Sequence, residues 1–236
     1  MANPNSTDSL DLYAKVEDLL ENSEAIQSLY GYYYATLAQL SFETLLDIGC
    51  GSGDFLIALA DQFGDLSLKG IDLSLVMAAR ARAKGVDAAA VDLCEVDGKF
   101  DVMTAVFDMM NYLPDTALEG FFDCLKAHLN EGGYFLFDIN TLYGFENVAV
   151  GAYIVEDERR FVAIDSDFEE GHYRADFTLF ENASDECYKK STQTIHQFHH
   201  TVDRLLEASG MTLVVDQELS LYGLEEADKR FVILQK

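Results

Sequence analysis

Short apolar runs alternate with helical patterns between residues 44 and 140. The apolar runs lie at 44–48, 66–71, 86–91, 100–107 and 134–139, and each has a length that suits a buried strand. Between them, helices are predicted at 54–60, 75–84 and 114–129, two of them opened by Ser74 and Pro114. This alternation predicts a parallel sheet with right-handed helical crossovers.

The two ends of the chain and residues 150–200 follow other patterns. Apolar and aromatic residues recur at helical spacing from 11 to 39, which predicts two N-terminal helices. Residues 150–200 alternate apolar and polar positions between acidic turns, which predicts an antiparallel meander of three or four strands. A helix at 201–209, ended by Gly210, and strands at 211–215 and 231–234 are predicted to complete the chain.

Three glycines follow the first apolar run directly, at Gly49, Gly51 and Gly53. Glycine lets the backbone turn sharply and approach a ligand closely, because it has no Cβ atom. The second run ends on Asp72, which lies 72 − 53 = 19 residues after the last glycine. At about this spacing, an acidic residue meets the two hydroxyls of a ribose. The sequence therefore predicts a nucleoside pocket at the carboxyl ends of two parallel strands.

The charges around the glycine turn indicate which nucleoside the pocket suits. Asp54 stands where the dinucleotide fingerprint G-x-G-x-x-G/A has its third small residue. Asp47 adds a second carboxylate, and no Lys or Arg occurs between residues 43 and 68. Such a site would repel a pyrophosphate at the start of the helix, whereas a ligand with a sugar and a cationic group would suit it.

An ordered set of motifs resembles the class I S-adenosylmethionine-dependent methyltransferases. The set consists of Leu46-Asp-Ile-Gly-Cys-Gly-Ser-Gly53, Gly70-Ile-Asp-Leu-Ser74 and Val91-Asp-Leu93. The segment 100–113 is similar to the family's fourth strand and its loop, and 129–138 to its glycine turn and fifth strand, with Glu131 where proline is usual. Residues 12–16 and 107–113 further resemble amino-sugar N-methyltransferases, a small-molecule branch with an inserted antiparallel sheet.

This resemblance implies an α/β fold. The expected core is a Rossmann-like doubly wound sheet of about seven strands, mostly parallel, with N-terminal lid helices and a small antiparallel β insertion. The lid helices are expected at 1–40 and the cofactor-binding core at 41–142. The insertion at 143–200 would form a roof over the substrate, and the C-terminal helix and strands at 201–236 would complete the core sheet.

The resemblance also implies the cofactor and the residues that bind it. S-adenosyl-L-methionine is the expected cofactor, and S-adenosyl-L-homocysteine the product. Asp72 would accept hydrogen bonds from the ribose hydroxyls, Asp47 would attract the cofactor's ammonium, and the turn at 49–53 would support its methionine part. The complete set of expected cofactor-binding residues is Tyr13, Asp47, Gly49, Cys50, Gly51, Gly53, Asp72, Leu73, Met77, Asp92, Leu93 and Phe107.

Catalytic candidates are expected mainly in the rim after the fourth strand, which faces the transferable methyl group in this family. Asp108 is a candidate to hold an amine, Tyr112 to orient the nucleophile, and His199 to act as a base or contact the substrate. His199 belongs to a cluster with His196 and His200 whose spacing is poor for a metal without a third nearby ligand. No metal is expected.

Composition narrows the partners and the location. The 236 residues carry 42 acidic and 16 basic side chains, a net charge of −26 that disfavours nucleic acid and anionic lipid. A small-molecule acceptor is expected instead. No apolar run is long enough for a membrane span, and the polar start does not resemble a signal peptide. The four cysteines, at 50, 94, 124 and 187, are scattered, which predicts a reducing cytoplasmic location without a disulfide framework or zinc site.

Three functions remain open at this point. The leading interpretation is methyl transfer to a small molecule, with an amine as the first candidate acceptor. The alternative is a non-catalytic or regulatory S-adenosylmethionine-binding protein of the same fold. The third is a nicotinamide-dependent dehydrogenase. Asp54 argues against it, because the dinucleotide fingerprint has a small residue at this position. The sequence does not indicate which atom is methylated or whether a base is needed. It also indicates no pathway and no oligomeric state.

Overall fold

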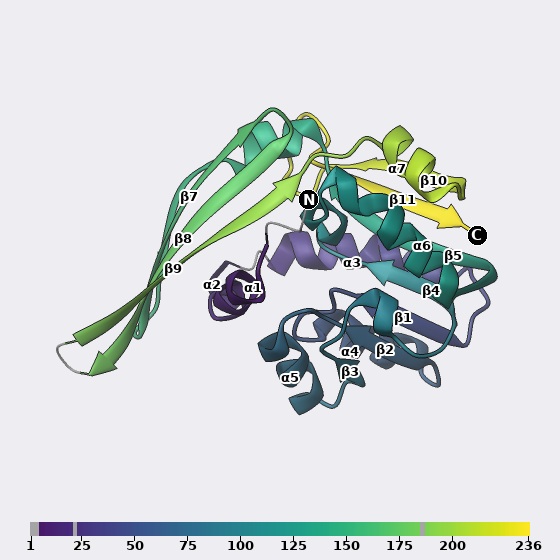
Figure 1. Cartoon of the computed structure of the whole chain (residues 1–236), viewed down its shortest axis with the longest axis horizontal. Coiled ribbons are helices and arrows are strands. Elements are labelled where there is room, and N and C mark those ends of the chain that lie inside the picture. Colours follow the sequence, from purple (N-terminus) through teal and green to yellow (C-terminus); the bar gives the residue numbers. More distant parts are fainter. Residues whose placement is uncertain (1–4, 21–22, 185–186) are drawn as a thin grey trace.

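A computed structural model describes residues 5–20, 23–184 and 187–236 and contains a core sheet with helices on both faces (Figure 1). The strand order is β10-β11-β5-β4-β1-β2-β3. Strands β1 to β5 pair in parallel, whereas β11 runs antiparallel between β5 and β10. The strands are β1 Thr44–Ile48, β2 Ser67–Ile71, β3 Ala88–Ala89, β4 Phe100–Ala105, β5 Leu129–Asn140, β10 Thr212–Leu219 and β11 Lys229–Gln235. The predicted seven-stranded, mostly parallel sheet is confirmed.

The helices pack on two apolar layers because strand residues alternate between the faces of the sheet. Leu46 and Phe135 lie in the layer beneath α6 and α7, whereas Leu45 and Leu136 lie in the layer beneath α3 and α4. The helices are α1 Thr7–Ala14, α2 Glu17–Leu20, α3 Ser23–Leu37, α4 Asp54–Phe63, α5 Leu75–Ala83, α6 Leu118–His128 and α7 Val202–Ser209. The short turns are η1 Leu93–Glu95, η2 Met109–Tyr112, η3 Asp115–Ala117 and η4 Gly144–Ala149. Among the described residues, no helix has both the length and the apolar character that crossing a membrane requires.

A second sheet of four antiparallel strands confirms the predicted insertion. Its order is β6-β7-β8-β9, and its long strands extend away from the core sheet (Figure 1). Leu12 and Val16 of the N-terminal segment pack into an apolar cluster with Phe177 and Ile195 of this sheet. The N-terminal helices therefore lie against the inserted sheet. Its strands are β6 Gly151–Glu156, β7 Arg160–Glu169, β8 His172–Ser184 and β9 Cys187–Phe198.

Three predicted elements differ in the structure. The described residues 7–20 and 23–37 contain three helices instead of two, and the predicted break falls partly on residues 21 and 22, which lie outside the described ranges. The strand predicted at 86–91 shortens to β3, because this edge strand pairs only with the end of β2, at Gly70 and Ile71. The helix predicted from Pro114 begins with the tight turn η3 and continues as α6.

Candidate functional site: a glycine turn, two buried carboxylates and a tyrosine rim

The turn after β1 needs its glycines for conformation and for space. Gly49, Gly51 and Gly53 all have positive φ, at 73°, 53° and 83°. A Cβ on Gly49 would lie 2.6 Å from Cγ of Met109, whereas a Cβ on Gly51 would meet no atom within 4 Å. The turn is therefore packed on the Met109 side and open at Gly51, where a ligand could approach the backbone.

Asp72 lies just beyond the end of β2 and faces this turn. Its Oδ2 accepts a hydrogen bond from the backbone N–H of Gly51 at 2.9 Å, and its Oδ1 accepts one from Ser74 at 2.8 Å. Burial raises the pKa of Asp72, and these two hydrogen bonds oppose the shift. A carboxylate has about four lone-pair positions, so two remain to accept hydrogen bonds from a pair of hydroxyls.

Asp47, near the end of β1, is the second carboxylate of the site and is buried. Only 2% of Asp47 is exposed, and its Oδ1 accepts a hydrogen bond from the Thr104 hydroxyl at 2.7 Å. Burial raises the pKa of Asp47 to about 7, and the nearby charge of Asp72 adds to the shift. Burial also raises the pKa of the neighbouring Cys50 thiol, which therefore stays protonated. The site is thus suited to a cationic group that would favour the ionised form of Asp47.

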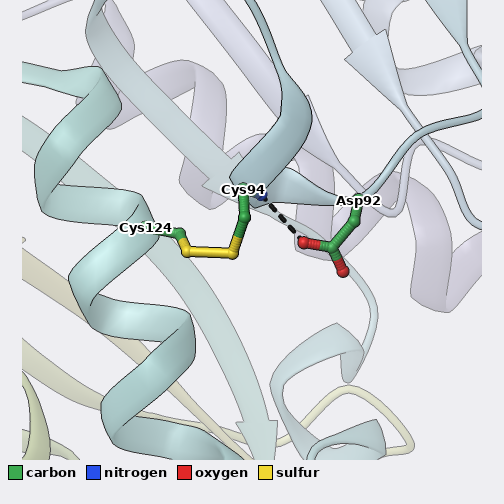
Figure 2. Close-up of a disulfide and its surroundings, with 3 residues drawn as sticks. All are labelled: Asp92, Cys94 and Cys124. Carbon is green, nitrogen blue, oxygen red and sulfur yellow. Dashed lines mark hydrogen bonds between the residues drawn. A yellow bond between two sulfur atoms is a disulfide. The ribbon is translucent and has the colours of Figure 1, made fainter.

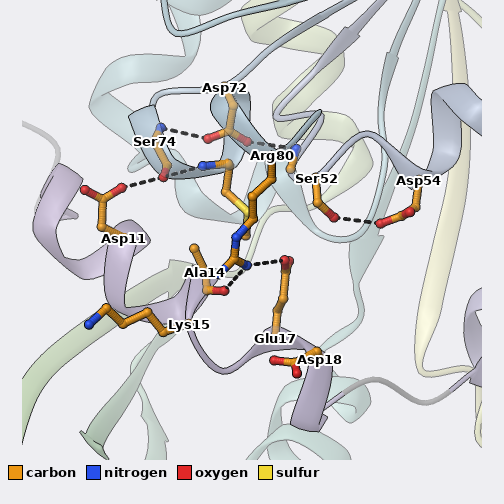
Figure 3. Close-up of polar contacts among 12 residues, drawn as sticks. Asp11, Ala14, Lys15, Glu17, Asp18, Ser52, Asp54, Asp72, Ser74 and Arg80 are labelled. Carbon is orange, nitrogen blue, oxygen red and sulfur yellow. Dashed lines mark hydrogen bonds and ion pairs between the residues drawn. The ribbon is translucent and has the colours of Figure 1, made fainter. Parts of the chain in front are cut away.

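Asp54 is exposed at the start of α4. Its carboxylate accepts a hydrogen bond from the Ser52 hydroxyl (Figure 3). It also accepts hydrogen bonds from the ammonium of Lys84, at 2.7 and 2.8 Å. The start of α4 is therefore occupied by an exposed ion pair. This arrangement disfavours a phosphate at the start of the helix.

The predicted adenine side consists of residues from α5 and from the turn η1. Met77 and Leu93 are buried, whereas Leu73 is 46% exposed. Asp92 is exposed, and its Oδ1 accepts a hydrogen bond from the N–H of Cys94 at 2.8 Å (Figure 2). The Asp92 carboxylate thus caps the turn whose backbone is expected to face the adenine.

A disulfide between Cys94 and Cys124 joins η1 to α6 (Figure 2). The prediction of no disulfide framework was therefore wrong for this pair. Spacing in sequence gave no sign of it, because the two cysteines are 30 residues apart and come together only when α6 packs beside η1. Cys50 and Cys187 are free thiols. With this disulfide, the cysteines no longer support the predicted reducing location.

The N-terminal helices are held to α5 by polar contacts. The Ser74 hydroxyl donates a hydrogen bond to Asp11, and the Arg80 guanidinium contacts the carbonyl oxygen of Ala14 and, at 3.2 Å, the carboxylate of Glu17 (Figure 3). Because Ser74 and Asp72 belong to the same β2–α5 turn, these contacts fix α1 beside the candidate ribose site. The ring of Tyr13, on α1, makes an edge contact with Phe177 of the inserted sheet.

The rim after β4 brings several predicted residues together. Burial raises the pKa of the Tyr112 phenol, and the neighbouring Tyr13, Tyr173 and Asp72 add to the shift. The Tyr112 hydroxyl is therefore a hydrogen-bond donor at neutral pH and no base. Asn111 is fully buried and donates to the carbonyl oxygen of Phe198, which ties the rim to the inserted sheet.

Asp108 and His199 lie in different surroundings from those expected. Asp108 forms an ion pair with Lys229, a residue that sequence reasoning missed. His199 lines a separate cavity of about 670 Å³ with Tyr143 and Glu225, and neither Asp108 nor Tyr112 lines that cavity. The structure thus places Tyr13 and Tyr112 in one apolar cluster, whereas His199 lines a different cavity. Within the described ranges, no cluster of His, Cys, Asp and Glu suits a metal ion.

Two further residues behind the rim, Tyr33 and Asp138, were missed together with Lys229. All three are buried, and their side chains join each other by hydrogen bonds and an ion pair. A lysine at the start of an apolar terminal strand was the available signal, because a buried lysine needs a partner. Its partner could not be identified from sequence, since Asp138 is 91 residues away.

Comparisons with known proteins agree with this geometry. Residues 45–133 match the family model described as "Methyltransferase domain". A protein of Geobacillus sp. (strain WCH70), named "Putative methyltransferase", is 24% identical over 208 residues, which are 81% of this chain and 83% of the relative.

Solved structures with the same fold include methyltransferases. An S-adenosylmethionine-dependent methyltransferase from Clostridium acetobutylicum is 20% identical, with a TM-score of 0.73 and 96% of each chain covered. An amino pentose methyltransferase from Micromonospora echinaspora, solved with S-adenosylmethionine bound, is 23% identical. Its TM-score is 0.70, with 95% of this chain and 97% of that chain covered.

Proposed function

We propose that this chain is an S-adenosylmethionine-dependent methyltransferase and that it transfers a methyl group to the amine nitrogen of a small molecule. The matched domain and the curated relative support the family and the enzyme class that the motifs predicted, and the solved structures share the fold. The acceptor and the roles of individual residues belong to the proposal.

The residues of the cleft fit the cofactor by their donor and acceptor chemistry. Asp72 has acceptor positions for two ribose hydroxyls, and the open backbone at Gly51 leaves room for a ligand. Asp47 offers a buried carboxylate to the ammonium of the amino acid part. On the other side, Met77, Leu93 and Asp92 would surround the adenine. Bound S-adenosylmethionine supplies a methyl group activated by a sulfonium.

The observation that carries the amine proposal is the chemistry of the rim. Tyr112 stays protonated, Asp108 is paired with Lys229, and His199 lines another cavity. A hydroxyl acceptor benefits from a base, whereas an amine in its neutral form carries its own lone pair. The amino pentose methyltransferase with this fold supports the same choice. The residues described at the rim therefore suit a nitrogen nucleophile, with alignment as their main contribution.

The inserted sheet supports the choice of a small acceptor. It lies over the N-terminal helices, and Tyr173 on β8 adds to the shift in the pKa of Tyr112, so it adjoins the rim. A site enclosed between lid, rim and roof suits a small molecule better than a polymer. The net charge of −26 also favours a neutral or cationic acceptor over nucleic acid.

Methyl transfer with a deuterium-labelled cofactor tests the proposal. The purified chain would be incubated with trideuteromethyl S-adenosylmethionine and matched pairs of sugars that differ only by an amine or a hydroxyl at one carbon. We expect mass spectrometry to find the label on an amino sugar and not on its hydroxyl partner. If only the hydroxyl partner carried the label, the proposal of an amine acceptor would be rejected. Cofactor binding without transfer to any acceptor in a broad panel would favour the non-catalytic alternative.

A further inference from the structure

Two consecutive residues at the end of β4 have a backbone conformation that is unusual for side chains. Phe107 and Asp108 have φ angles of 57° and 59°, in the left-handed region that normally favours glycine. Neither is a glycine, so this kink persists only if the surrounding structure holds it. The kink lies directly before η2, which carries Asn111 and Tyr112.

The carboxylate of Asp138 holds the kink from the neighbouring strand. Its Oδ1 accepts a hydrogen bond from the N–H of Phe107 at 2.8 Å, and its Oδ2 accepts one from the N–H of Asp108 at 3.1 Å. Asp138 lies on β5 and is fully buried. The two carboxylate oxygens thus accept hydrogen bonds from two successive N–H groups. The left-handed conformation lets both N–H groups point toward the same carboxylate.

Two buried side chains fix Asp138 in turn. The Tyr33 hydroxyl, from α3, donates to Oδ1 of Asp138 at 2.9 Å. The ammonium of Lys229, from β11, donates to Oδ2 of Asp138 at 2.9 Å and to Oδ1 of Asn140 at 3.1 Å, and it also pairs with Asp108. Tyr33 and Lys229 are 0% and 2% exposed. A helix and a strand from opposite ends of the chain therefore meet on one carboxylate.

The kink sets the position of the residues that face the cofactor turn and the acceptor. Met109, immediately after it, packs against Gly49, where even a Cβ atom would clash. Asn111 accepts a hydrogen bond from the N–H of Asn140 and donates to Phe198 of the inserted sheet. Tyr112 ends the same turn, beside Tyr13. A change in backbone direction at 107–108 would displace all of them together.

We propose that Asp138, held by Tyr33 and Lys229, is the positioning residue of the acceptor rim: it maintains the left-handed kink at Phe107 and Asp108 and thereby places Asp108 and Tyr112 where the acceptor amine meets the methyl group. This inference rests on the proposed function for the identity of the rim. It also gives a role to Lys229, a lysine that is only 2% exposed at the edge of the site.

A pair of cofactor analogues tests this inference without knowledge of the acceptor. S-adenosylhomocysteine lacks the methyl group and probes the cofactor site alone. Sinefungin carries an amine where the cofactor carries its transferable methyl, so it also probes the rim. Calorimetry would measure both affinities for the wild type, for Asp138→Asn and for the control Asp228→Asn. Asp228 is 1% exposed and its carboxylate accepts hydrogen bonds from the N–H groups of Leu221 and Tyr222 in a different loop.

We expect Asp138→Asn to weaken sinefungin binding roughly tenfold more than S-adenosylhomocysteine binding, about the effect of one charge-assisted hydrogen bond. The asparagine amide cannot accept from both N–H groups, so a crystal structure of the variant should show negative φ at Phe107 or Asp108. The control should leave the ratio of the two affinities at the wild-type value. Equal weakening of both ligands by Asp138→Asn, or an unchanged kink, would overturn the inference.

Tyr33→Phe keeps the test decisive if Asp138→Asn does not fold. It removes one hydrogen bond to Asp138 and retains the packing of the ring, so the ratio should shift in the same direction by roughly twofold to fivefold. An unchanged ratio in this variant would contradict the inference. Failure of methyl transfer would be seen separately, because a chain that binds both ligands and transfers no methyl group contradicts only the proposed function.

Discussion

Each carboxylate oxygen of Asp72 accepts a hydrogen bond from a backbone N–H group, of Gly51 or of Ser74. These two bonds fix the orientation of the carboxylate and hence the direction of its remaining lone pairs. We expect Asp72→Asn to weaken S-adenosylhomocysteine binding about a hundredfold, because hydrogen bonds to a charged group are worth about 1.5–3 kcal/mol each and two are disturbed. Isothermal titration calorimetry would measure the change.

Asp54→Asn is the matched control for this variant, since Asp54 belongs to the same turn region and pairs outward with Lys84. Its affinity for S-adenosylhomocysteine should stay within about twofold of the wild type, as expected for an exposed ion pair. If Asp72→Asn kept wild-type affinity in a folded protein, the assignment of the ribose site would be wrong.

Asp47 gives the cofactor site a pH dependence with a definite sign. Its pKa is about 7 in the folded protein, raised by burial, against about 3.9 for an unperturbed aspartate. Between these values the folded state holds a proton that the unfolded state has released. The stability contributed by this group is therefore complete below about pH 3.9 and is lost as the pH rises through about 7.

Ligand binding should show the opposite trend, because the ligand's ammonium favours ionised Asp47. We expect the affinity for S-adenosylhomocysteine to rise between pH 5.5 and 7.5, by up to about tenfold per unit below the pKa. The raised pKa of Asp72 contributes in the same direction, so the comparison with Asp47→Asn is essential. An equally steep pH dependence in that variant would exclude Asp47 as its source.

At the scale of elements, the disulfide ties η1 to α6 and closes a loop of 30 residues. Loop-closure entropy predicts that it stabilises the fold by roughly 3–4 kcal/mol. For a chain of this length, Cys124→Ser should lower Tm by roughly 6 °C or more. A dithiol reductant should have the same effect on the wild type and none on the variant.

Cys187→Ser is the control for the disulfide prediction, because Cys187 is an exposed free thiol. Its Tm should match that of the wild type in scanning calorimetry. If Cys124→Ser melts at the wild-type temperature under oxidising conditions, the covalent link does not contribute to stability.

The elements show how far the sequence alone predicts this structure. The glycine turn and Asp72 were predictable because strand, turn and acidic residue follow each other in a fixed local order. The network of Tyr33, Asp138 and Lys229 was not, because its members come from three elements far apart in sequence and meet only after the sheet forms. The same reason applies to the disulfide and to the separation of His199 from the rim.

At the scale of the whole molecule, the candidate cleft lies where three parts of the chain meet. The carboxyl ends of the core strands carry the proposed cofactor residues, and Asp11 and Arg80 fasten the N-terminal helices beside Asp72. The inserted sheet packs on those helices. All three parts of the chain therefore adjoin the proposed cofactor site. The network of Tyr33, Asp138 and Lys229 lies where these parts meet. It can therefore affect the site through the rim without contacting the cofactor turn.

Thermal unfolding in the presence of three ligands tests the central claim most directly. S-adenosylmethionine, S-adenosylhomocysteine and NAD would be added separately to protein that mass analysis shows to be free of bound cofactor. A ligand at a hundredfold excess over its Kd stabilises a protein by about 2.7 kcal/mol, which corresponds here to a rise in Tm of roughly 5–10 °C. We predict this rise with both adenosyl-sulfur ligands and none with NAD. No rise with either of them, or an equal rise with NAD, would contradict the account.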